Sequence, residues 1–499
     1  MEPRLLRQKL IFAPLISLIS AAVGVFFFHL PLWDGPMYGD DYLLVQGALQ
    51  PNGNNGFLQD IWLAGGGKWR PANTPILLWL AKRWEFSYLP YQLLNLVLLV
   101  ICASIVGFAV YYISKSLVAC ALGAFTISVS HFTWLAQISV YGVMELSAAI
   151  FFILACISAL RVFMASGKES PNMTLWTFTS ATLLLLSTFT HERYLFASIG
   201  FWLVFLNYSR SSSTKRVLPH IFMMIPIIHV FFKGIILGLN PLAGGGESSL
   251  KDVGGLWIFK HLGDAFLGLF GYYSGSGKYY SDWPLGRLAE QSNLGFVGLT
   301  IALIPILLYL FAKLFLRKPS DFKTSVKISH SELFLFSILF LTLLPAATVL
   351  QSIEFRWLFV PQILLLLLFT SLVTQMVLPS RYKTPLVIFL PVCFIFLSLY
   401  YRHESKVFTL LRDQPSELVR TIEKIAPKQG SWFLEIIQPD SAMPTNWQLG
   451  YGGIFSQMTN PPYQIVSKSE DCRAINHSIP CISVTIDGSS TKFDIKIIN

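Results

Sequence analysis

The chain has 499 residues, of which 54% are hydrophobic and only 13% are charged. A soluble protein of this length would need several domains with charged surfaces, so the composition excludes the soluble globular class. Repeated apolar runs separated by short basic stretches are typical of an all-α polytopic membrane protein. The net charge of +10 is therefore assigned to basic cytoplasmic loops, and we expect no nucleic-acid partner.

Apolar runs of bilayer length predict a transmembrane domain over residues 1–402 with about eleven spans. Arg4, Arg7 and Lys9 precede the first span, and each predicted cytoplasmic turn carries basic residues. The N-terminus is therefore expected in the cytoplasm and the C-terminus outside. The first span lacks a clear cleavage site, which predicts an uncleaved anchor. The spans are expected near residues 10–30, 89–113, 116–134, 143–163, 175–190, 194–207, 217–238, 293–316, 333–350, 357–378 and 385–401.

This topology places two long loops, 31–88 and 239–292, on the outer side. The second loop contains "LWIFKHLGDAFLGLF", an amphipathic segment expected at the membrane interface. Residues 403–499 resemble a small soluble domain in composition. We expect a small α/β extracytoplasmic domain here, with a helix in "QPSELVRTIEKIA" and strands in "SWFLEIIQ", "YQIVS", "CISVTID" and "TKFDIKII".

Cys472 and Cys481 are the two cysteines of this C-terminal segment. In an oxidising outer compartment they predict a disulfide that closes a small loop, and two unrelated free thiols are the alternative. The other cysteines lie within predicted spans, where cysteine is most often a small apolar residue: Cys102, Cys120, Cys156 and Cys393.

The stretch "MYGDDYLLV" places two adjacent carboxylates, Asp40 and Asp41, just beyond the first span. A carboxylate at the membrane–water boundary can take a proton from an incoming hydroxyl group, or hold a divalent cation such as Mg²⁺ or Mn²⁺. A solvated loop or a helix cap is the alternative. The pair alone does not decide between these interpretations.

Four segments that follow form an ordered series of motifs. "KWRPANTPILLWLAKRWEFSYLPYQLLNLVLLV" and "SHFTWLAQISVYGVMELSAAIFFILA" come first, and "STFTHERYLF" and "QSIEFRWLFVPQ" come later. In order and spacing they resemble the motifs of the GT-C glycosyltransferases, in particular the O-mannosyltransferase branch. Gln92 stands where that family has a histidine, and Ala136 or Gln137 stands near the place of an acidic residue. The matching residues are Trp69, Arg70, Pro71, Pro90, Asn95, His131, Glu145, Leu146, Arg356 and Pro361.

Three adjacent ionisable residues, His191, Glu192 and Arg193, lie between two short apolar runs. Ionisable groups at membrane depth usually mark a cavity or a site, and a short outer hairpin in water is the alternative. Arg356 stands beside Glu354 at the outer edge of a span, so an ion pair between them or snorkelling to the interface is the alternative to phosphate binding.

Two further pairs of residues allow a functional and a structural interpretation. His131 and Glu145 either support the site or pair with one another inside the bundle. Lys68 and Arg70, which flank Trp69, either reach the site or contact lipid headgroups.

The resemblance implies an enzyme that transfers a sugar from a polyprenyl-phosphate carrier to an acceptor hydroxyl on the outer face, with inversion at the anomeric carbon. Asp40 or Asp41 would be the general base, with Asp40 narrowly favoured, and either could hold Mg²⁺ or Mn²⁺. Loop 239–292 would form a wall of the site, and the C-terminal domain a lid or acceptor platform. The donor phosphate would be bound by Arg356, His191, Arg193 and Arg70. The supporting residues would be Glu192, His131, Glu145 and Glu354.

The expected partners are the polyprenyl-phosphate-linked donor, membrane lipids and a glycan, lipid or protein acceptor. The disulfide-competent segment favours a bacterial inner membrane with the C-terminal domain in the periplasm. Two other functions stay open. One is an envelope-glycan enzyme of the O-antigen polymerase or ligase type, and the other is a lipid-linked-sugar flippase or transporter without catalysis. A transporter would predict an inverted internal repeat, which the sequence does not show.

Overall fold

The computed structural model describes the helices and strands of the chain together with short connecting stretches. The described residues are almost entirely helical, apart from four strands near the C-terminus. They are residues 3–30, 32, 41, 44, 45, 49, 69–133, 139–164, 173–209, 217–238, 255–270, 329–347, 355–376, 379–405, 414–425, 432–437, 463–466, 481–486 and 493–498.

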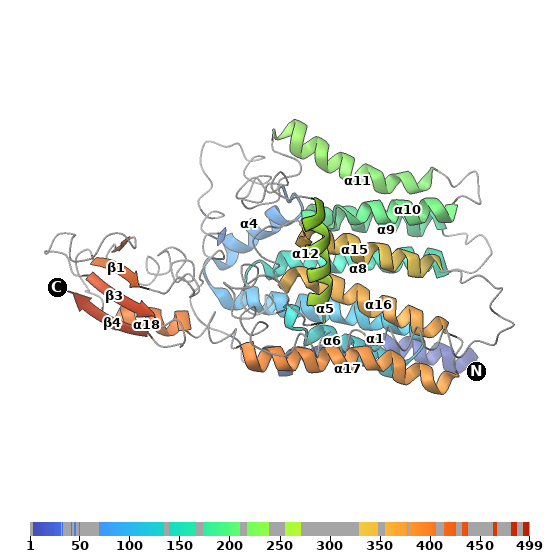
Figure 1. Ribbon diagram of the computed structural model, residues 1–499, viewed down its shortest axis with the longest axis horizontal. Coiled ribbons are helices and arrows are strands. Elements are labelled where there is room, and N and C mark those ends of the chain that lie inside the picture. The colour runs from blue at the N-terminus through green and yellow to red at the C-terminus, as the bar shows by residue number, and fades with distance from the viewer. Residues whose placement is uncertain are drawn as a thin grey trace.

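The long helices lie side by side in one bundle (Figure 1). Within the described residues, seven helical stretches are long and apolar enough to cross a membrane, and the chain is an integral membrane protein. The predicted span 293–316 lies outside the described residues, so the count of about eleven stays a prediction. The bundle contains α1 (Pro3–His29), α5 (Tyr88–Ser114), α6 (Leu117–Ser128), α8 (Gly142–Met164), α9 (Met173–Thr190), α10 (Ala197–Ser209), α11 (Ile221–Val230), α15 (His330–Ala347), α16 (Phe359–Gln375) and α17 (Ser380–Ser405).

Helices α5 and α6 form an antiparallel hairpin with a very short turn. Lys115 takes the left-handed conformation with a φ of 56° and ends α5. The Ser116 hydroxyl then accepts a hydrogen bond from the backbone N–H of Ala119 at 3.3 Å and begins α6. A side chain at Gly107 would put its Cβ 2.7 Å from the Cβ of Ala124, so glycine permits the close approach of the two helices.

The short elements that carry the candidate site lie between the long helices. They are η1 (His131–Thr133) after α6, η2 (Glu192–Tyr194) after α9, and η8 (Phe355–Leu358) before α16. The backbone N–H of Ala72, just before α4 (Asn73–Trp84), donates to the carbonyl of Phe189 near the end of α9. Figure 1 shows α4 at one end of the bundle, opposite the end at which the N-terminus lies.

Helix α12 (Gly255–Gly268) runs across the other helices rather than along them (Figure 1). The ring of Phe266 stacks on Phe340 of α15, with ring centroids 5.9 Å apart, whereas Phe259 is 73% exposed. The amphipathic pattern in loop 239–292 therefore folds as a helix with one covered face. Its depth in a bilayer stays a prediction.

The C-terminal segment contains the predicted helix and all four predicted strands. The strands are β1 (Trp432–Ile437), β2 (Tyr463–Val466), β3 (Cys481–Ile486) and β4 (Phe493–Ile498), and the helix is α18 (Gln414–Ile425). The sheet order is β2-β1-β3-β4, with β1 parallel to β2 and β3, and β4 antiparallel to β3.

Buried side chains of this segment share an apolar cluster with the α4 end of the bundle. Ile422 of α18 and Val484 of β3 belong to the same cluster as Leu80 of α4. In Figure 1 the sheet lies beyond α4. The domain boundary at residue 402 and the side of the membrane on which the sheet lies stay predictions.

Candidate functional site

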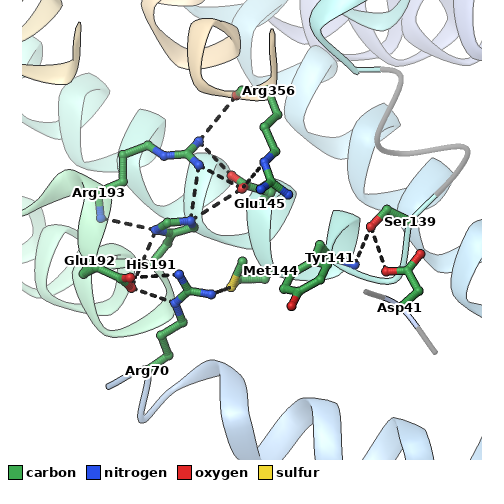
Figure 2. Close-up of polar contacts among 10 residues, drawn as sticks. All are labelled: Asp41, Arg70, Ser139, Tyr141, Met144, Glu145, His191, Glu192, Arg193 and Arg356. Carbon is green, nitrogen blue, oxygen red and sulfur yellow. Dashed lines mark hydrogen bonds and ion pairs between the residues drawn. The ribbon is translucent and has the colours of Figure 1, made fainter. Parts of the chain in front are cut away.

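Six charged or titratable side chains from four distant segments meet in one cluster, which we call the arginine cluster (Figure 2). Arg70 precedes α4, Glu145 stands in the first turn of α8, and Arg356 lies on η8. The remaining three come from the turn between α9 and α10: His191, Glu192 and Arg193. All six were predicted site residues, and the fold brings them together.

Arg70 and Glu192 form a bidentate ion pair across 122 residues of sequence. The Nε and Nη2 atoms of Arg70 donate to the Glu192 carboxylate at 2.6 and 2.8 Å. The third guanidinium nitrogen lies 3.0 Å from the sulfur of Met144. The planar fork of arginine matches a carboxylate in this geometry, which fixes Arg70 against η2.

Arg193 and Glu145 form a second bidentate pair, with both N–O distances at 2.9 Å. His191 lies between the two carboxylates. Its Nδ1 accepts a hydrogen bond from the backbone N–H of Arg193 at 3.2 Å, and Nη2 of Arg193 lies 3.3 Å from the other ring nitrogen, Nε2. That nitrogen lies 3.5 Å from Glu145 Oε1, and Nδ1 lies 3.8 Å from Glu192 Oε2.

Arg356 is the most exposed of the three arginines. Its side chain is 24% exposed, compared with 11% for Arg70 and 6% for Arg193. Its Nε lies 3.8 Å from Glu145 Oε1, and its guanidinium stands over the ring of Tyr141, 5.8 Å from the centroid. Arg356 is therefore the arginine of the cluster that an incoming ligand can reach most directly.

The arginine cluster carries a net positive charge. Three guanidinium groups and two carboxylates give 3 − 2 = +1, provided that His191 is neutral. Burial, and then the nearby charges of Arg193 and Arg70, lower the pKa of His191 to about 4. Burial opposes ionisation of Glu192, but Arg70 outweighs it and holds the pKa of Glu192 well below its usual value. The cluster is thus cationic at neutral pH and suits an anionic ligand.

Asp41 lies beside the arginine cluster, held by the segment that leads into α8. The Ser139 hydroxyl donates to Asp41 Oδ1 at 2.9 Å, and the backbone N–H of Tyr141 donates to the same hydroxyl at 3.1 Å. Figure 2 shows Tyr141 between the Asp41–Ser139 pair and the arginine cluster. Asp41 is only 5% exposed. Of its two predicted alternatives, the solvated loop carboxylate is therefore wrong for Asp41, and the helix cap stays a prediction.

Three other structural alternatives from the sequence are also wrong. His191, Glu192 and Arg193 do not form a water-exposed hairpin, because their side chains are 6–18% exposed. Arg70 is not a headgroup contact, because its side chain is 11% exposed and pairs with Glu192, and Trp69 beside it is 1% exposed and stacks on Phe232.

The third alternative was a pair of His131 with Glu145. In the described contacts Glu145 instead binds Arg193, and Nδ1 of His131 lies 3.2 Å from the Ser398 hydroxyl on α17. His131 is thus buried against α17, and a supporting role for it in the site stays a prediction.

Several predicted residues lie outside the described part of the chain. These are Asp40, Glu354, Lys68 and Cys472. Cys481 is described only as the first residue of β3. The disulfide therefore stays a prediction. Within the described residues, no group of three or more His, Cys, Asp or Glu side chains could hold a metal ion. An Mg²⁺ or Mn²⁺ site at Asp40 and Asp41 also stays a prediction.

Sequence reasoning missed a buried lysine beside the cluster. Lys233 is 2% exposed and lies on η5 (Phe231–Ile236), a π-helical continuation of α11. Its charge interacts with those of Glu192 and Arg70. His229, one turn earlier, packs edge-on against Trp69, with ring centroids 5.0 Å apart. The signal was present, because two ionisable residues four positions apart in a predicted span share one helix face.

Comparisons with known proteins do not identify the family of this chain. No protein-family model matches it, and no curated protein matches it. A similar solved structure is the crystal structure of ArnT from Cupriavidus metallidurans in the apo state. The match covers 95% of this chain and 92% of that chain, at 10% identity and a TM-score of 0.34. A likeness at this level decides neither fold nor function.

Proposed function

We propose that this protein is an integral-membrane glycosyltransferase of the GT-C type. It would take a sugar from a polyprenyl-phosphate carrier and pass it to an acceptor hydroxyl on the outer face of the membrane. The observation that carries this proposal is the position of Asp41 beside the arginine cluster, linked to it through residues 139–145. A base and a phosphate-binding group are the two functions that such a transfer requires.

Asp41 is the proposed general base. It takes the proton of the acceptor hydroxyl while the acceptor oxygen forms a bond to the anomeric carbon. The bond from that carbon to the phosphate oxygen breaks, and its electron pair stays on the phosphate. Because the acceptor attacks from the face opposite the leaving group, one displacement inverts the anomeric carbon.

Arg356 is the proposed ligand of the carrier phosphate. A phosphodiester carries one negative charge, which matches the net charge of +1 on the arginine cluster. The leaving phosphate gains further negative charge, which nearby guanidinium groups stabilise. The forks of Arg70 and Arg193 are occupied by Glu192 and Glu145. These two arginines therefore supply positive potential and hold the site together.

A panel of radiolabelled donors tests the proposal with the purified full-length protein. We expect sugar transfer from at least one polyprenyl-phosphate sugar, and loss of transfer in Asp41→Asn. Transfer only from diphosphate-linked glycans would favour a polymerase or ligase. Movement of labelled lipid across proteoliposome membranes without sugar transfer would favour a flippase. Either of the last two results would overturn the proposal.

A further inference from the structure

Ser139 makes polar contacts in three directions. Its hydroxyl donates to Asp41 and accepts from the backbone N–H of Tyr141. Its carbonyl accepts from the side-chain amide of Asn95 on α5 at 2.7 Å. Asn95 is itself confined, because a Cβ on Gly142 would lie 2.4 Å from its Nδ2. Ser139 is therefore held from α5 and from the start of α8.

The Ser139 hydroxyl acts as an acceptor and as a donor at the same time. A backbone N–H can only donate, so it occupies a lone pair of the hydroxyl oxygen and leaves the hydroxyl proton for Asp41. A hydrogen bond donated to a carboxylate favours the ionised form. Both side chains are buried, at 5% exposure for Asp41 and 7% for Ser139, and a buried charge needs such a donor.

We propose that Ser139 is a positioning residue that orients the Asp41 carboxylate and keeps it ionised for proton transfer. The inference rests on the proposed function, in which Asp41 is the base. It also explains how the base is aligned with the phosphate ligand. The same short segment carries Tyr141, whose ring faces Arg356, and Glu145, whose carboxylate lies near Arg356.

The test compares Ser139→Ala, Ser139→Thr and Ser139→Cys in the full-length protein with a donor that the wild type uses. Ser139→Ala removes the hydroxyl, and we expect kcat to fall about 10- to 100-fold, with the donor KM little changed. The acid limb of the kcat/KM profile should move to higher pH, because the carboxylate loses a donor. Tyr91 of α5, a titratable group that interacts electrostatically with Asp41 and donates to the Glu85 carbonyl, stays unchanged in every variant.

Two variants separate positioning from a merely structural role. Ser139→Thr keeps the hydroxyl and should restore most of the activity and the original acid limb. Ser139→Cys has a side chain of similar shape, but its thiol is only a weak hydrogen-bond donor. It should shift the acid limb to higher pH, as Ser139→Ala does. It therefore tests the inference even if Ser139→Ala does not fold. Ser158→Ala is the matched control, because that buried hydroxyl bonds within α8 to Leu154, and we expect no change.

Two results would overturn the inference. One is a Ser139→Ala or Ser139→Cys variant with activity within twofold of the wild type, and the other is reduced activity with an unmoved acid limb. A wild type that transfers sugar from no donor contradicts the proposed function instead, so the two failures are distinguishable.

Discussion

Arg193 and Glu145 bind one another through two hydrogen bonds of 2.9 Å, and both side chains are less than 10% exposed. The pair joins η2 to α8 and so fixes the turn between α9 and α10 against the rest of the bundle. The carboxylate also lies 3.8 Å from Nε of Arg356. This one contact therefore connects the stability of the fold with the electrostatics of the site.

We predict that Arg193→Gln strongly destabilises the protein. Removing one partner of a buried ion pair costs up to about 3–5 kcal/mol, because Glu145 then keeps only its longer contacts with Arg356 and His191. Thermal or denaturant unfolding in detergent measures the change. Arg83→Gln is the matched control, because Arg83 is an exposed arginine on α4, and its effect should stay within about 0.5 kcal/mol. A cost below about 1 kcal/mol for Arg193→Gln would contradict a buried pair.

Arg356→Gln should instead lower sugar transfer more than stability. The side chain is partly exposed, so its removal leaves less charge buried, but the leaving phosphate loses its proposed ligand. We expect kcat to fall about 10²- to 10³-fold, the usual effect of removing a group that stabilises charge in the transition state. Arg356→Lys should retain part of the activity. Transfer rates in Arg356→Gln equal to those in Arg83→Gln would exclude Arg356 as the ligand.

Acidification should destabilise the protein between pH 6.5 and about 4. In the folded protein the pKa of His191 is about 4, whereas an unfolded histidine has a pKa of about 6.5. The unfolded chain therefore binds the proton first as the pH falls, and each such group lowers stability by up to about 1.4 kcal/mol per pH unit in this window.

Two other groups act in the same direction. Burial lowers the pKa of His131 to about 3, so its contribution to the stability of the protein is lost over a wider pH range than that of His191. Glu192, with its pKa well below the usual value, contributes stability that is lost only at still lower pH. Melting curves of wild type and His191→Gln across this range test the assignment. The variant should show the shallower dependence, and parallel curves would contradict it.

Cys472 and Cys481 should be oxidised to a disulfide. Closing the eight-residue loop between them restricts the unfolded chain and contributes on the order of 2–3 kcal/mol by the chain-entropy estimate. Mass spectrometry of the non-reduced protein checks the bond directly. If both thiols are free to alkylate in protein from its native membrane, the assignment of this segment to an oxidising compartment loses its support.

The two adjacent aspartates should differ in their effect on transfer. Asp41→Asn is nearly isosteric and should lower transfer by about 10²- to 10⁴-fold, as for the loss of a positioned acid–base group. Asp40→Asn should lower it less, because the contact with Ser139 belongs to Asp41. A larger loss in Asp40→Asn would restore the first member of the pair as the base. Size-exclusion profiles of both variants show whether folding is intact.

Much of the bundle was predictable because apolar runs of bilayer length leave few alternatives to a spanning helix. The site residues could be predicted because they are ionisable groups near predicted spans. Which of them form ion pairs with one another could not be predicted. Nothing in the spacing of Arg70 and Glu192 indicates that they meet, since the contact depends on how α4 and α9 pack.

The burial of Trp69 and Lys233 was missed for a related reason. Trp69 lies in the predicted outer loop 31–88, where contact with headgroups or water is the common outcome, and Lys233 lies inside the predicted span 217–238. Lys233 lies on the π-helical turn at Phe231–Ile236. Such a turn has no recognisable pattern in the sequence.

In the proposed reaction the chain breaks the bond between a sugar and a carrier phosphate, with Asp41 as the base. The most direct measurement is the stoichiometry of products in one reaction with a polyprenyl-phosphate sugar labelled in both the sugar and the lipid. We expect one polyprenyl phosphate released for each sugar that appears on the acceptor with inverted configuration, and neither product above background in Asp41→Asn. Equal amounts of both products from wild type and Asp41→Asn, or sugar transferred with retained configuration, would contradict it.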